Sequence, residues 1–192
     1  MWRILYAPQV YIGLHMANLS LSLVNQKLAY ARAMLKKAAA LGVSTTAAEK
    51  LQLQAMIDAA VFHLMCGFNH YLREVAETYQ VKDVAMVNDC ASLWAALGVI
   101  DKEPAEALEL QLLAGDNSSW LGQLQRYYQG LWLAPKADQE RRDKEEEQEN
   151  LIAVKVIDAS DDDQEVGLEV IQSWEVSFVA MIVRQRETSS EY

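Results

Sequence analysis

The stretch that decides the fold is residues 21–38, LSLVNQKLAYARAMLKKA. Its apolar residues recur in alternating steps of three and four, a spacing that places them on one side of an α-helix. They are Leu21, Val24, Leu28, Ala31, Leu35 and Ala38. The polar and basic residues of the stretch all lie at the positions between them. The stretch therefore predicts one long amphipathic helix that buries a single face.

The two ends of this helix follow from its neighbours. Gly42 predicts the C-terminal end, because glycine adopts the left-handed backbone conformation that commonly closes a helix. The apolar spacing continues backwards to Val10, and Pro8 is accepted in a first helical turn, so we expect the helix to begin near residue 8. A competing interpretation starts the chain at Met16 and treats residues 1–15 as an uncertain N-terminal extension.

A second long helix is predicted to follow at once. The sequence Thr46-Ala-Ala-Glu49 matches a capping box, in which the two side chains satisfy free backbone amides at a helix start. The apolar spacing then runs to about Tyr79, giving a helix of roughly 50 Å at 1.5 Å per residue. The buried face is expected at Leu53, Ile57, Ala60, Leu64, Phe68, Tyr71 and Val75. Two such helices joined across residues 42–45 are expected to pack antiparallel.

Shorter helices are predicted after residue 80. Asp83 is placed to cap a helix that ends near residue 98. Pro104 is placed where a helix could start, so another helix is predicted from there through Leu113. Ser118 or Ser119 is expected to cap the next one. These patterns give two or three short helices to pack on the long pair.

The next part of the sequence changes character. Residues 136–149 carry four basic and seven acidic side chains and predict a solvated acidic linker. Residues 151–157 are apolar and β-branched, and we expect an extended segment lying on the bundle. Helical spacing returns with Ile171, Trp174, Phe178 and Ile182, so a C-terminal helix is predicted over residues 165–187, before a polar tail at 188–192.

The fold class predicted from these patterns is all-α. We expect an antiparallel helical bundle over residues 16–135, with two long helices and two or three shorter ones. The acidic linker and short extended segment, residues 136–164, are expected outside it, and the C-terminal helix is expected to pack on it.

Charge limits the classes of partner. The 192-residue chain has 27 acidic and 17 basic residues, a net charge of -10. Affinity for nucleic-acid phosphates comes mainly from clustered Lys and Arg, so we expect no nucleic acid partner and no anionic membrane surface. The one basic concentration comprises Lys27, Arg32, Lys36 and Lys37. We expect it to contact acidic segments of the chain or an interface partner.

The compartment predicted is the cytoplasm. The apolar stretches near the C-terminus fall well short of the roughly 18 to 20 residues that cross a bilayer, so we expect no membrane. Cys66 and Cys90 lie inside helical patterns rather than in a dense disulfide framework, which favours a reducing compartment.

One group of side chains suggests a metal site. His63, Cys66 and His70 follow one another at offsets of three and four, which places them on one side of the second helix. Imidazole and thiolate are natural ligands for zinc, and bundles can converge such groups. The competing interpretation is structural, because this side lies next to the main apolar face. A metal or small ligand near these residues is therefore an alternative hypothesis.

The sequence favours a non-enzymatic function. It contains no nucleophile elbow, phosphate loop or glycine-rich dinucleotide turn. Amphipathic helices without a catalytic set predict a protein that binds an unknown protein partner or itself through its helical faces. The tryptophans expected at that interface, if exposed, are Trp120, Trp132 and Trp174. A weaker hypothesis takes residues 136–165 as a mimic of nucleic acid that occupies a basic partner.

Several segments resemble an uncharacterised family of small proteobacterial proteins known only as a domain of unknown function. The matching segments are Asn25-Gln-Lys-Leu-Ala-Tyr-Ala-Arg32, Phe62-His-Leu64 with Glu74 and Tyr79, Ser119-Trp-Leu121 with Tyr128 and Leu131-Trp132, Asn150-Leu-Ile-Ala-Val154, and Arg184-Gln-Arg-Glu187. The resemblance implies an all-helical bacterial cytoplasmic protein and brings no activity with it. Arg73 and Cys66 depart from the family pattern, and both departures disfavour a metal.

Overall fold

The computed structural model describes residues 10–133 and 166–189, and in these ranges it contains helices and no strand. In chain order they are α1 (Val10–Ala40), α2 (Ala47–Thr78), a short 3-10 turn η1 (Val84–Met86), α3 (Cys90–Val99), α4 (Ala105–Gly115), α5 (Trp120–Gly130) and α7 (Leu168–Ser189). The all-α class is confirmed. The predicted acidic linker at 136–149 and extended segment at 151–157 lie outside the described residues, as do residues 1–9.

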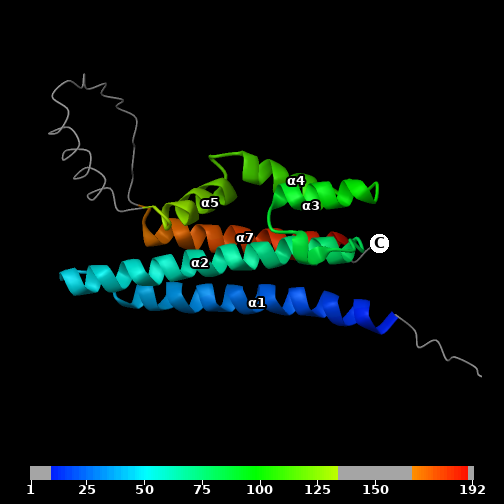
Figure 1. Cartoon of the computed structure of the whole chain (residues 1–192). Helices are drawn as coiled ribbons and strands as arrows, with labels where there is room; N and C mark the ends of the chain where they lie inside the picture. Colours follow the sequence, from blue (N-terminus) through cyan, green and yellow to red (C-terminus); the bar gives the residue numbers. More distant parts are fainter. Residues whose placement is uncertain (1–9, 134–165, 190–192) are drawn as a thin grey trace, which may run out of the picture.

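Helices α1 and α2 form an antiparallel hairpin (Figure 1). Helix α1 ends at Ala40, and Gly42 has the left-handed φ of 64° that the sequence predicted. The Thr46 hydroxyl accepts from the Glu49 amide at 3.2 Å, and the Glu49 carboxylate accepts from the Thr46 amide at 3.0 Å. The capping box is therefore confirmed. Every predicted apolar residue of α1 from Val24 to Ala38 is buried, but Leu21 is exposed.

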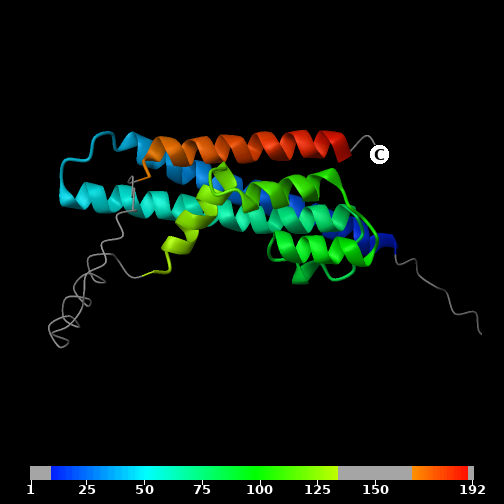
Figure 2. The same cartoon turned by 90° about the horizontal axis from the view of Figure 1, so that it is seen from above.

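Helix α7 completes the long part of the bundle. Figures 1 and 2 show that it runs beside α2 in the same direction and opposite to α1. Its buried apolar side chains are Ile171, Trp174, Phe178, Met181 and Ile182. Helix α5 crosses α2 and α7 obliquely, and α3 and α4 pair over the end of α2 where α7 ends (Figure 2).

The core is centred on Phe178 of α7, which is completely buried. Its ring centroid lies 6.1 Å from that of Phe68 and 6.3 Å from that of Tyr71, both on α2. Trp120 of α5 stacks on the same ring at 5.6 Å. A Cβ at Gly67 would lie 3.5 Å from the Phe178 ring, an ordinary van der Waals contact, so the ring packs directly beside this position.

The predicted third helix is wrong at its start. Asp83 makes no side-chain cap; residues 84–86 form only η1, and α3 begins at Cys90. The reason is a second capping box, in which Asp89 accepts from the Ser92 amide at 2.7 Å. The carbonyl of Val87 is also taken by Arg73 Nε at 3.0 Å. The helix therefore begins at Cys90 and not after Asp83, and its buried residues are Leu93 and Leu97.

Helix α5 begins with a close backbone approach. Ser119 is its N-cap and accepts from the Gly122 amide at 2.9 Å. A Cβ at Gly122 would collide with the carbonyl oxygen of Asp116 and lie 3.1 Å from Cα of Asn117. The backbone of the turn between α4 and α5 therefore packs so closely on position 122 that only glycine fits there.

We expect Gly122→Ala to lower the free energy of unfolding by about 1 to 3 kcal/mol, because backbone atoms must move to admit the methyl group. Gly130→Ala is the matched control, since a Cβ there would meet nothing within 4 Å. Urea denaturation followed by circular dichroism measures both. Equal stability of the two variants would contradict the close approach.

Candidate functional site

The three predicted metal ligands are all half-buried on α2. His63 lies against the rings of Tyr30 and Phe62, and its Nδ1 atom is buried without a hydrogen-bond partner. Among the described residues, no three His, Cys, Asp or Glu side chains come together as a metal site requires. The structure therefore does not assemble His63, Cys66 and His70 into a ligand set.

Burial sets the protonation of these groups. It lowers the pKa of His63 and His70 below the usual range, and the charge of nearby Lys27 acts in the same direction. Burial also raises the pKa of the Cys66 thiol. Because the thiolate is the form that binds metal, this environment opposes ligation by Cys66. Neutral side chains on this part of α2 are instead suited to apolar contacts.

The predicted interface tryptophans have three different environments. Trp174 is only 2% exposed, and its Nε1 donates to Gln123 Oε1 at 3.2 Å. Trp120 is half-buried in the stack on Phe178. Trp132 is 69% exposed and lies just beyond the end of α5. Of the three, Trp132 therefore has the exposure expected of an interface residue.

Trp132 ends a continuous row of rings that crosses three helices. We call this row, Tyr30, His63, Phe62, Tyr128 and Trp132, the aromatic strip. Successive ring centroids are 5.2, 5.8, 6.4 and 6.0 Å apart. Tyr30, Phe62 and Trp132 are exposed, and His63 and Tyr128 are half-buried. Contiguous exposed aromatic groups of this kind mark interaction sites on soluble proteins.

Positively charged side chains lie beside the α1 end of the aromatic strip. Lys27 Nζ lies 5.9 Å from the centroid of the Tyr30 ring. Lys37 is exposed, and because it comes seven residues after Tyr30 it lies on the same side of α1. The nearby carboxylate of Asp58 accepts from Tyr127 Oη at 3.0 Å and from Gln54 Nε2 at 2.8 Å.

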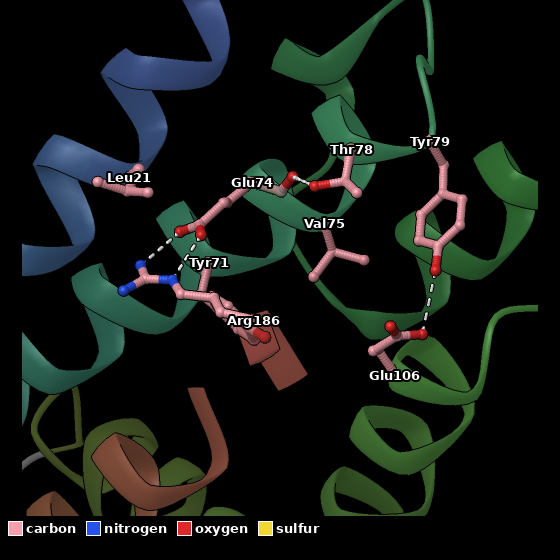
Figure 3. A pocket seen from close by; sticks show the side chains of 8 residues that line it. All are labelled: Leu21, Tyr71, Glu74, Val75, Thr78, Tyr79, Glu106 and Arg186. Carbon is pink, nitrogen blue, oxygen red and sulfur yellow. Dashed lines mark hydrogen bonds and ion pairs between the residues drawn. The ribbon is translucent and has the colours of Figure 1, made fainter. Parts of the chain in front are cut away.

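A pocket of about 320 Å³ lies at the other end of the bundle (Figure 3). It is lined by Leu21, Tyr71, Glu74, Val75, Thr78, Tyr79, Glu106 and Arg186. Arg186 of α7 binds Glu74 with two hydrogen bonds, Nε to Oε1 at 2.7 Å and Nη2 to Oε2 at 2.8 Å. Tyr79 donates to Glu106 Oε2 at 3.1 Å. Figure 3 shows these two pairs on opposite sides of Val75.

The polar groups of this pocket bind one another. Tyr71 donates to Gln185 Oε1 at 2.7 Å, and burial raises the pKa of Tyr71. Burial and Glu106 raise the pKa of Tyr79 to about 12. Both phenols are therefore neutral donors at physiological pH, and neither is activated as a base or nucleophile. The arrangement fastens α7 to α2 and does not resemble a catalytic set.

A second ion pair fastens α7 to α1. Arg32 Nε donates to Glu175 Oε1 at 2.6 Å. Arg32 belongs to the basic concentration for which the sequence predicted an acidic or interface partner. The partner found lies on α7, outside the acidic linker.

Helix α2 has a property that sequence reasoning missed. Its most apolar 18-residue window has a mean hydropathy of 1.3, so by length and composition it is the one helix among the described residues that could cross a membrane. The core helix of a globular protein passes the same test, and 12 residues of α2 are buried in the bundle. The finding is weak evidence of a membrane span.

Sequence reasoning also missed most of the aromatic strip. Tyr30 and Phe62 lie off the apolar faces of their helices, and a large aromatic residue in such a position is a signal of exposure. The bonds between Glu74 and Arg186 join residues 112 positions apart. Their spacing carries no signal, because they meet only once α7 has docked.

We expect Arg186→Gln to lower the free energy of unfolding by about 2 to 3 kcal/mol, because the buried Glu74 carboxylate loses its counter-ion. Arg184 provides the matched control. It pairs with Glu109 near the surface, where its side chain is 60% exposed. Arg184→Gln should cost under about 1 kcal/mol. Thermal and urea unfolding measure the stability of both variants. Equal losses of stability would show that the ion pair of Arg186 with Glu74 stabilises the protein no more than that of Arg184 with Glu109.

The comparisons with known proteins identify a family and add no activity. The model of a family of unknown function, DUF6586, matches residues 18–192. No curated protein and no solved structure matches the chain. The resemblance to an uncharacterised family, drawn from segments between residues 25 and 187, is confirmed. The chain belongs to the family of unknown function DUF6586.

Proposed function

We propose that this protein is a non-enzymatic protein of the bacterial cytoplasm that binds another protein through the aromatic strip. The observation that carries the proposal is the row of five rings ending in Trp132. Leu133, the next residue along the chain, is a second exposed apolar side chain, at 68%. Large aromatic side chains supply most of the binding energy at many interfaces.

The aromatic strip is arranged before any partner binds. His63 meets both Tyr30 and Phe62 edge-on, with interplanar angles of 61° and 70°. Tyr128 and Trp132 also meet edge-on, at 80°. Rings that already support one another lose little conformational freedom on binding, so more of the buried area contributes to affinity. This favours a docking surface over a group of unrelated exposed side chains.

The two thiols support the proposed compartment. Cys66 and Cys90 are both free. The Cys90 thiol donates to the carbonyl of Leu110 at 3.6 Å, and burial raises its pKa to about 11. Thiols kept reduced and protonated within helices are typical of proteins in a reducing cytoplasm.

Site-specific photo-crosslinking tests the proposed function. A photoreactive phenylalanine replaces Leu133, the residue after Trp132, and in a second chain it replaces Val176, which is 63% exposed on α7. In cells, we expect a crosslinked protein from position 133 and not from position 176. Adding Trp132→Ala should remove that product, because the main anchor of the surface is lost.

Three outcomes would count against the proposal. Equal crosslinking from both positions, or a product that persists in Trp132→Ala, would show that the aromatic strip is not the contact. A product of twice the chain mass would make the occupant a second copy of this protein. Circular dichroism of Trp132→Ala establishes that the variant is folded.

A further inference from the structure

We infer that the aromatic strip receives an amphipathic helix that carries carboxylates on both sides of one end, bound by Lys27 and Lys37. This inference rests on the proposed function of the strip and adds the chemistry of its partner. It is drawn from the distribution of charge over the three helices that bear the rings, and from the spacing of the rings themselves.

These three helices together carry a net positive charge, whereas the protein as a whole is negatively charged. The chain has a net charge of -10, yet α1 and α5 contain no Asp or Glu. In α2, Asp58 is the sole acidic residue between residues 51 and 72. The same helices carry Lys27, Arg32, Lys36, Lys37 and Arg126. The surface beside the rings is therefore electropositive on an acidic molecule, which favours a partner of opposite charge.

Two of these cations are placed to receive a partner. Arg32 is paired with Glu175, and Asp58 already accepts from Tyr127 and Gln54. Lys27 and Lys37 lie on the side of α1 that bears Tyr30, ten residues apart in sequence. At 1.5 Å per residue this is about 15 Å along the helix axis. A helix lying along the strip crosses α1 between these two lysines, so carboxylates on both sides of its α1 end would reach them.

The spacing of the rings suits a helix rather than an extended strand. Their centroids follow one another at 5.2 to 6.4 Å. Neighbouring side chains on one face of a helix, three or four residues apart, are separated by about 5 to 6 Å. Alternate side chains of an extended strand recur at about 6.6 to 6.8 Å instead. A helix with an apolar face therefore presents side chains in better register with the strip.

Two synthetic 21-residue helical peptides test the inference against the full chain. Both carry the same Leu and Trp residues on the apolar face; one has Glu on its flanks and the other has Lys. Fluorescence anisotropy at moderate salt measures their affinities. We expect the Glu peptide to bind about tenfold more tightly or better, because its flank is complementary to the lysines.

Replacing Lys27 and Lys37 by glutamate tests whether these two lysines bind the peptide. Lys27→Glu with Lys37→Glu should weaken the Glu peptide by about threefold to tenfold. The matched control is Lys82→Glu with Lys102→Glu, which changes the net charge equally at exposed residues outside the strip. The control should leave the affinity unchanged.

Each other outcome overturns the inference in an identifiable way. If both peptides bind equally and Trp132→Ala weakens both, the aromatic strip binds proteins without a preference for acid, and the proposed function survives. If the Glu peptide binds but Trp132→Ala has no effect on its affinity, the peptide is bound by the positive charges alone and not by the aromatic strip. If neither peptide binds, the strip does not accept a helix of this kind, and crosslinking from position 133 remains the separate measure of the proposed function.

Discussion

The structure depends on the insertion of the Phe178 ring beside Gly67. Helices α1, α2 and α7 meet at position 67, where a Cβ would make ordinary van der Waals contact with Cβ of Lys27 at 3.4 Å and with the Phe178 ring at 3.5 Å. The ring also contacts Phe68, and Trp120 stacks on it from α5. One aromatic residue thereby joins the hairpin, the C-terminal helix and the oblique helix.

The same packing determines which surface remains free. Helix α7 is held on one side of α2 by the core and by ion pairs from Arg32 and Arg186. Phe62 comes nine residues before Tyr71, half a revolution away at 100° per residue, so it lies on the side of α2 away from Phe178. The aromatic strip is thus formed by the sides of α1, α2 and α5 that α7 does not cover.

Local signals in the sequence were sufficient for the long helices. Thr46 and Glu49 form a reciprocal cap, and Gly42 ends α1 through its own conformational freedom, so these boundaries need no distant contact. The third helix was mispredicted because Asp83 and Asp89 are both acceptable caps by residue type. Ser92 and Arg73 decide between them, and the contribution of Arg73 depends on tertiary packing.

The candidate site was less predictable because it, too, depends on tertiary packing. Trp132 and Trp174 both occur in helical apolar patterns, and no local feature separates them. Only the path of α7 buries Trp174 against α5 and leaves Trp132 in solvent. The offsets of His63, Cys66 and His70 placed them correctly on one side of α2, but what that side faces depends on α1 and α5.

We expect the buried Trp174 to stabilise the bundle and the exposed Trp132 to contribute little to its stability. Urea unfolding of Trp132→Ala and Trp174→Ala beside the unchanged protein tests this expectation most directly. Loss of the buried Trp174 should cost about 3 to 5 kcal/mol. Loss of the exposed Trp132 should change stability by no more than about 0.5 kcal/mol. A Trp132→Ala variant as unstable as Trp174→Ala would make the aromatic strip a part of the core and contradict the account.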